Sequence, residues 1–414
     1  METYQALFEA LPLHQTVLAN RFVLSSMVTN SSTADGLVTQ EDLSYAERRA
    51  DAAPLQITGA AYVDPKGQLF EFGFSVAKDE DVDGLRKLAQ VMQSKGAKAI
   101  LQLTHAGRFS SHTLQRDKLV YGPSSMKLHA PFPHEVKELT IAELEELVEA
   151  YGQATRRAIE AGFAGVEISS AQRLLIQTFF SSFSNQRQDR YGCQNLENRS
   201  RFGLEVLRKV QGVIDQLAPA DFILGFRATP EETRGASIGY SIEEFLQFMD
   251  MALEVAGIDY LAIASWGHDV FRNQVRGAGH HQGRLVNQVV HDALKDRLVV
   301  MATGGINSSE KALEALEHAD MVGLSTPFIT DPEFVHKIAA GKPEDIQLRI
   351  KPEDLSKLAI PQASFKDIVP LMDYGESLPR ESREVFRSLY SSKIKMFRCQ
   401  LALKNLSSIF IIVA

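Results

Sequence analysis

Cysteine is nearly absent from this chain of 414 residues, which has only Cys193 and Cys399. Two thiols cannot build a disulfide framework or a cysteine-rich zinc site, so we expect a reducing compartment. Long hydrophobic runs are missing too, because the longest aliphatic stretch, 409–413, is far too short to cross a membrane. No basic and apolar leader begins the chain. We therefore expect a cytoplasmic protein with no membrane partner.

An excess of positive charge is also lacking. Lys and Arg total 44 against 52 Asp and Glu, which gives a net charge of −8 and a pI near 5.8. This balance argues against a broad surface for nucleic acid, whereas a small anion site remains compatible with it. The hydrophobic content of 44% and the charged content of 23% exclude a collagen-like, coiled-coil or wholly disordered chain. We expect a small-molecule ligand, and a homo-oligomer stays open.

The apolar residues gather in eight short runs, each followed by a polar or glycine-rich break. These predicted strands are 21–27, 55–62, 99–104, 165–168, 222–228, 260–264, 298–302 and 321–324. Helical periodicity marks the segments 40–51 (weakly), 83–95, 141–161, 196–216, 242–255, 286–294, 309–317 and 332–340. Eight strand–helix units predict an α/β fold, the closed (β/α)8 TIM barrel. No Gly-rich dinucleotide fingerprint follows a strand, which disfavours the open doubly wound alternative.

We predict one barrel domain, 1–340, followed by a C-terminal helical extension, 341–414. Basic residues interleave with apolar ones near the end of this extension, at Lys393, Lys395, Arg398 and Lys404. That pattern favours a helix that packs on the barrel or on a neighbouring subunit, although a frayed, solvated tail fits equally well.

Unusual polar residues stand in or after the predicted strands. Gln102 and Arg227 interrupt apolar runs, where a buried amide or guanidinium needs partners. Either they form a satisfied internal network, or they hold a ligand rich in carbonyl and ring-nitrogen groups at the mouth of the barrel. Gly304 and Gly305 precede a helix start near Ser308, an arrangement by which barrels bind phosphate.

Four segments, in the right order, resemble the old yellow enzyme family of FMN-dependent NAD(P)H oxidoreductases. They are Asn20–Met27, Gln102–Arg108, Ala161–Ile168 and the most specific one, Asn185–Phe202. The resemblance covers roughly residues 10–340 and implies an FMN lying on the mouth of the barrel.

The resemblance also implies the cofactor contacts. The implied FMN-binding residues are Ser25, Ser26, Met27, Ala60, Gln102, Arg227, Gly304, Gly305, Ser325 and Thr326. Of these, Gln102 and Arg227 would bond the polar edge of the ring, where Arg227 would stabilise the reduced anionic flavin. The implied oxidoreductase takes hydride from NADH or NADPH and passes it through flavin N5 to an acceptor such as an activated alkene.

The chain departs from the family at the catalytic positions. Where the family has a His, then a His or Asn, then a Tyr, this sequence has Ser169, Gln172 and Leu174. Ser169 and Gln172 can still donate hydrogen bonds and are the expected catalytic residues, whereas Leu174 cannot transfer a proton. Ser325 and Thr326 replace a Gly-Arg pair whose arginine binds the phosphate, so the charge-assisted contact is missing.

Further candidates and alternatives remain. We assign His105 and Arg108 to substrate binding, with a structural role equally compatible for His105. We predict no metal site, because His268, His280 and His281 have no spaced carboxylate or thiol beside them. The alternatives are a flavin-binding or partner module that has lost turnover, and a flavin-free barrel isomerase or lyase for a phosphorylated metabolite.

Overall fold

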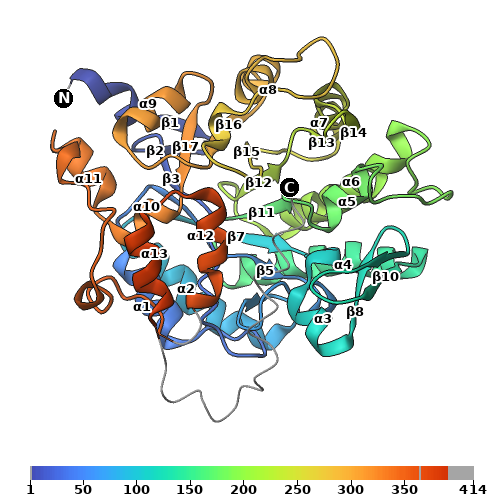
Figure 1. Ribbon diagram of the computed structural model, residues 1–414, viewed down its shortest axis with the longest axis horizontal. Helices are drawn as coiled ribbons and strands as arrows, with labels where there is room; N and C mark the ends of the chain where they lie inside the picture. The colour runs from blue at the N-terminus through green and yellow to red at the C-terminus, as the bar shows by residue number, and fades with distance from the viewer. Residues whose placement is uncertain (1, 363–364, 390–414) are drawn as a thin grey trace.

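A closed barrel of eight parallel strands forms the centre of the computed structural model, which describes residues 2–362 and 365–389 (Figure 1). The barrel strands are β3 (Phe22–Leu24), β4 (Leu55–Ile57), β7 (Lys98–Thr104), β11 (Gly165–Ser170), β12 (Ile223–Ala228), β15 (Tyr260–Ile263), β16 (Val299–Thr303) and β17 (Met321–Leu324). Each strand pairs in parallel with the next, and pairing of β7 with β11 and of β17 with β3 completes the ring. The predicted (β/α)8 barrel is confirmed.

Helices surround the barrel. They are α1 (Gln40–Arg48), α2 (Val82–Met92), α4 (Ile141–Glu160), α6 (Leu196–Leu217), α7 (Ile242–Val255), α8 (Val286–Leu294), α9 (Ser309–Leu316), α10 (Thr326–Thr330) and α11 (Phe334–Ala339). Three of them begin at reciprocal capping boxes, Thr39 with Asp42, Thr140 with Glu143 and Ser241 with Glu244. These side chains satisfy N–H groups at the first turn, so the sequence itself fixes where these helices start.

Two predicted strands differ from the structure by more than two residues. The predicted strand 21–27 is only Phe22–Leu24, and the predicted strand 55–62 divides into β4 and the short β5 (Ala61–Tyr62). The N–H of Thr58 still donates to the carbonyl of Ile100, after which the chain leaves the ladder and pairs again through Ala61 with Leu103. Apolar composition does not mark where pairing ends, and the released residues form loops at the mouth.

Short elements outside the barrel cover the amino ends of the strands and extend the loops at their carboxyl ends. They are β1 (Leu11–Leu13), β2 (Thr16–Leu18), β6 (Phe74–Ser75), β8 (Leu119–Gly122), β9 (Met126–Leu128), β10 (His134–Glu138), β13 (Glu232–Arg234), β14 (Ser237–Tyr240), α3 (Ser111–Asp117) and α5 (Leu175–Phe180). The β1–β2 hairpin sends Leu11, Leu13 and Leu18 into one apolar cluster with inward residues of the strands. The amino ends of the strands are therefore closed by apolar side chains, and polar residues collect at the carboxyl ends.

The chain beyond α11 packs back on its own barrel. It carries α12 (Val369–Gly375) and α13 (Arg380–Arg387), drawn in red in Figure 1. Buried residues such as Phe365, Met372 and Phe386 form one cluster with Phe70 of a barrel loop and Ile329 of α10. The rest of the predicted extension, including its four basic residues, lies outside the described residues. In the described part of the chain, no helix is long and apolar enough to span a bilayer.

Candidate active site

A cavity of about 250 Å3 opens at the carboxyl ends of the barrel strands, and we call it the central cavity. It is lined by all ten residues that the sequence assigns to the cofactor, and by Ser169 and Gln172. These residues come from the ends of seven different strands. Because only closure of the barrel brings those ends together, the fold itself assembles the predicted site.

A buried polar network supports one wall of the central cavity. The carboxylate of Glu167, which is 0% exposed, accepts a hydrogen bond from Gln102 Nε2 at 2.6 Å and one from the Tyr260 hydroxyl at 3.0 Å. Burial raises the pKa of Glu167, while the charge of Arg227 and the two hydrogen bonds act in the opposite direction. Arg227 in turn donates to the Ser25 hydroxyl at 3.1 Å.

This network fixes how Gln102 is presented. A carboxylate only accepts hydrogen bonds, so the amide nitrogen of Gln102 faces Glu167, and its carbonyl oxygen is left for a ligand. Strand register places Glu167 opposite both Gln102 and Gly225. A Cβ atom on Gly225 would lie 2.2 Å from the ring of Tyr260, so only glycine lets that ring pass to reach Glu167.

The loop after β16 forms the opposite end of the central cavity. Gly304 and Gly305 have φ angles of +89° and +84°, a backbone conformation that side chains disfavour. Helix α9 follows, with its first turn capped by the Ser308 hydroxyl. Lys311 lies behind this turn, 3.3 Å from the Gly305 carbonyl and 2.7 Å from an oxygen of Asp269. The sequence alone did not single out Lys311, which forms an ion pair with Asp269.

The two expected catalytic residues stand at the end of β11. Ser169 is buried and lies in register with Arg227, while Gln172 lines the central cavity beside Leu174. Gln172 and Arg173 have φ angles of +56° and +64°. Two successive non-glycine residues in the left-handed region are uncommon, and such strain concentrates at functional sites.

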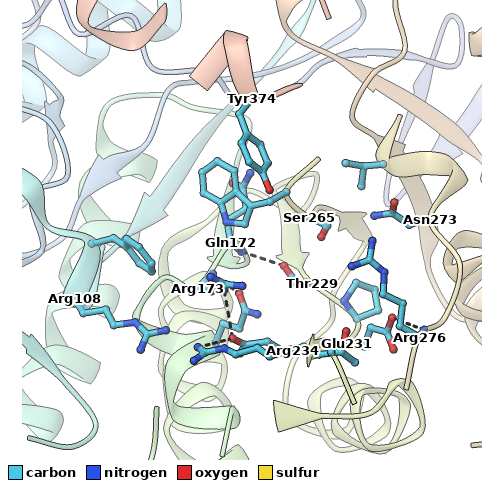
Figure 2. Close-up of a pocket in the computed structure, with 18 of the residues that line it drawn as sticks. Arg108, Gln172, Arg173, Thr229, Glu231, Arg234, Ser265, Asn273, Arg276 and Tyr374 are labelled. Atoms are coloured by element: carbon cyan, nitrogen blue, oxygen red, sulfur yellow. Dashed lines mark hydrogen bonds and ion pairs between the residues drawn. The ribbon is translucent and has the colours of Figure 1, made fainter. Parts of the chain in front are cut away.

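A second cavity of about 690 Å3, which we call the outer cavity, adjoins the first (Figure 2). The residues that line both cavities are Phe109, Ser111, Gln172, Ser265, Trp266, Val270 and Tyr374. Arg108, assigned from the sequence to substrate binding, lines the outer cavity. The outer cavity therefore lies directly beside the central one.

The other residue assigned to substrate binding, His105, is not brought to the site. Its ring is buried, it lines neither cavity, and its Nδ1 accepts the N–H of Gly107 at 3.1 Å. Burial lowers the pKa of His105 to about 4, with Asp64 opposing this shift and Lys66 adding to it. The structure thus places His105 as a neutral packing residue behind the site.

Residues that sequence reasoning missed come mainly from the C-terminal segment. Ile368, Met372 and Tyr374 of this segment line the central cavity, and the Tyr374 ring packs edge-on against Trp266 at 5.6 Å between centroids. Two polar contacts fix the segment: His268 Nε2 lies 2.8 Å from Glu376, and Asn307 donates to the Ser377 carbonyl at 2.9 Å. No local pattern in the sequence shows this long-range contact.

No group of three or more His, Cys, Asp or Glu side chains in the described residues could hold a metal ion. His280 and His281 pack against each other at 5.1 Å between ring centroids, and His268 is used by Glu376.

Comparison with known proteins identifies the family. The model of the NADH:flavin oxidoreductase / NADH oxidase family matches residues 6–345. An uncharacterized oxidoreductase of Streptococcus pyogenes is 68% identical over 94% of this chain and 98% of its own length. A probable NADH-dependent flavin oxidoreductase of Bacillus subtilis, YqiG, is 33% identical over 88% of this chain and 96% of its own.

A solved structure has the same fold. An old yellow enzyme homologue from Zymomonas mobilis superposes with a TM-score of 0.69 at 22% identity, covering 81% of this chain and 93% of that chain. The sequence matches, the closed barrel and the polar cavity at its mouth agree with one another. The chain belongs to the NADH:flavin oxidoreductase / NADH oxidase family, whose members bind FMN, and it is an NAD(P)H-dependent flavin oxidoreductase.

Proposed function

We propose that the central cavity holds FMN, and that the enzyme transfers reducing equivalents from NADH or NADPH to a small acceptor bound against Ser169 and Gln172. The observation that carries this proposal is the convergence of twelve predicted residues on one cavity. FMN, when bound, supplies the step that accepts two electrons from the nicotinamide and donates them to the acceptor.

The chemistry of the donor set fits FMN. The Gln102 carbonyl and the Arg227 guanidinium offer one acceptor and several donors at one side of the cavity, which suits a ring edge with both N–H and carbonyl groups. The positive-φ glycines, Gly304 and Gly305, with Ser325 and Thr326, offer backbone and hydroxyl donors for a phosphate. Ser325 and Thr326 stand where the resemblance implies a Gly-Arg pair. Their hydroxyl and backbone groups can hold a phosphate without that arginine, but the contact is weaker than a charge-assisted one.

Ser169 and Gln172 would orient the acceptor. A hydroxyl and an amide can both donate to an acceptor oxygen, and such donors stabilise the negative charge that grows on it as hydride arrives. The N–H of Gln172 bonds to the Thr229 hydroxyl at 3.0 Å, which leaves the side-chain amide at the cavity. The hydrogen bond to Thr229 fixes the backbone of Gln172 and so holds its side-chain amide in position.

Tyr374 would supply the proton that Leu174 cannot. It is the phenol that lines both cavities, and Figure 2 shows its hydroxyl directed into the outer cavity. A phenol is a common general acid, and the packing of its ring against Trp266 fixes its position.

Anaerobic stopped-flow measurements test the proposal by separating the two half-reactions. We expect NADH or NADPH to bleach the bound flavin, and a panel of activated alkenes to restore its colour. Ser169→Ala and Gln172→Leu should slow transfer to the acceptor by about 10- to 1000-fold, because each removes a donor. Tyr374→Phe keeps the ring and should slow only reoxidation, since reduction by the nicotinamide needs no proton donor.

Failure of both nicotinamides to bleach the flavin contradicts the proposal. Bleaching without reoxidation by any acceptor favours instead a flavin-binding module that has lost turnover.

A further inference from the structure

The outer cavity has an excess of positive charge. Arg108, Arg173, Arg234 and Arg276 line it, together with only two carboxylates, Glu231 and Glu232. The chain as a whole has a net charge of −8, so this excess is local and does not reflect composition.

Both carboxylates already have partners. Glu232, which is 5% exposed, lies 3.3 Å from Arg173 Nε and 3.4 Å from a terminal nitrogen of Arg234. Glu231 accepts two backbone N–H groups, from Arg276 at 2.8 Å and from Gly277 at 3.0 Å. Neither carboxylate is therefore left to pair with Arg108.

Arg108 lies beside this cluster without a carboxylate of its own. Its Nε atom is screened from solvent and has no hydrogen-bond partner, a terminal nitrogen lies 3.8 Å from the sulfur of Met126, and the guanidinium lies 5.4 Å from the centroid of the Phe109 ring. Burial lowers the pKa of Arg108 to about 10; Glu232 opposes this shift, and Arg234 and Arg173 add to it. The group stays charged at neutral pH, and a desolvated charge without a counter-ion is unfavourable.

The backbone presents the neighbouring arginine to the same space. Arg173 has a φ angle of +64°, and its N–H donates to the side chain of Gln177. Gln177 is held by the Tyr240 hydroxyl at 2.8 Å. Figure 2 shows the guanidinium groups of Arg108, Arg173 and Arg234 directed toward one another on one side of the cavity. Like charges gathered around one shared carboxylate form a site for an anion.

We propose that Arg108, Arg173 and Arg234 bind an anionic group, a carboxylate or phosphate, of the ligand that reaches over the central cavity. The two cavities adjoin at Gln172 and Tyr374, and in this proposal one ligand extends from the central cavity into the outer one. This inference rests on the proposed function. The anion has two possible sources, which are the carboxylate of an unsaturated acid acceptor and the pyrophosphate of the nicotinamide dinucleotide.

Calorimetric titration of the flavin-loaded enzyme tests the first source. The probes are crotonate and its neutral amide, crotonamide, on the unaltered protein and on Arg108→Met, which removes the charge without unpairing a carboxylate. We expect Arg108→Met to weaken crotonate binding by about 10- to 100-fold and to leave crotonamide unchanged. The matched control is Arg86→Gln, on the outer surface of α2 beside Asp83, which should change neither probe.

Stopped-flow reduction tests the second source. NADH is compared with N-benzyl-1,4-dihydronicotinamide, which has the same ring and no phosphate. If the pyrophosphate is the anion, Arg108→Met weakens NADH binding by a similar factor and leaves the benzyl compound unchanged. Reduction by the benzyl compound also tests the proposed function without involving the arginines. If the benzyl compound does not reduce the flavin, the proposed function fails; if it does but the arginine variants have no effect on NADH or crotonate, only the anion site fails.

A second variant distinguishes loss of the anion site from misfolding of Arg108→Met. Arg234→Gln alters a side chain that is 45% exposed and should reproduce the effect in the same direction. Loss of crotonate affinity or of NADH affinity in both variants supports the proposal. The proposal is overturned if both variants bind crotonate and NADH as tightly as the unaltered protein, or if that protein binds neither anion more tightly than its neutral analogue.

Discussion

Glu167 sets the charge balance at the wall of the central cavity where we propose that the flavin ring binds. Its carboxylate contacts Gln102 and Tyr260 and stands against the charge of Arg227, all within the barrel interior. A buried guanidinium next to a buried carboxylate has less effect on a ligand than a guanidinium alone, because the two fields partly cancel. Glu167 therefore moderates the stabilisation that Arg227 gives to a reduced, negatively charged flavin.

Replacing Glu167 by Gln tests this balance. Glu167→Gln keeps the side-chain shape and removes the negative charge, so Arg227 acts uncompensated and the flavin midpoint potential should rise by on the order of 30 mV. Spectroelectrochemical titration measures the shift. The matched control is Asp42→Asn, a second buried carboxylate that accepts from Thr39 in the capping box of α1 and lines neither cavity. An equal potential in Glu167→Gln and the unaltered protein would contradict this role.

His105 carries a prediction about acid stability. Its pKa is about 4 in the folded protein and near 6.5 when exposed, so the unfolded chain binds the extra proton first as the pH falls. This histidine should therefore remove about 2 kcal/mol of stability between pH 7 and pH 5. Denaturant unfolding of His105→Gln at both pH values should show that loss reduced by about this amount. An identical loss in the variant would show that His105 is accessible to protons in the fold.

At the scale of elements, α12 and the β1–β2 hairpin close opposite ends of the barrel with different consequences. The hairpin inserts Leu13 among the inward residues of the strands, on the side without a polar cavity. Helix α12 contributes Met372 to the apolar cluster at the mouth and to the lining of the central cavity. The hairpin completes the apolar core at one end of the barrel, and α12 covers the central cavity at the other.

Truncating one side chain at each end separates these two effects. Both Leu13→Ala and Met372→Ala remove a buried side chain and should cost about 2–5 kcal/mol of stability. Only Met372→Ala should lower the ratio of FMN to folded protein after gel filtration, because only it opens the central cavity. Equal retention of FMN by the two variants would show that α12 does not cover the cofactor.

At the scale of the whole molecule, the eight strands followed from apolar runs and the helices between them from helical periodicity. These are local signals, and the barrel repeats them eight times. The gathering of Gln102, Arg227 and Gly304 followed as well, since the carboxyl ends of barrel strands meet at one face.

What escaped sequence reasoning depends on contacts between distant segments. The path of residues 341–389 over the mouth is one case, because the short helix α12 gives little periodicity and its partners Met27 and Phe70 lie far earlier in the chain. The position of His105 is another, since its motif predicts a place at the strand end and not the direction of its ring. The pairing of Glu232 with both Arg173 and Arg234 likewise depends on tertiary structure, because it brings β13, which carries Glu232 and Arg234, next to the segment after β11.

The measurement that tests the central claim most directly is the visible absorption spectrum of the freshly purified protein, before and after anaerobic addition of NADH or NADPH. The account predicts a yellow protein with close to one FMN per chain, whose flavin absorption is lost on addition of at least one of the two nicotinamides. A colourless protein that cannot be reconstituted with FMN would contradict it.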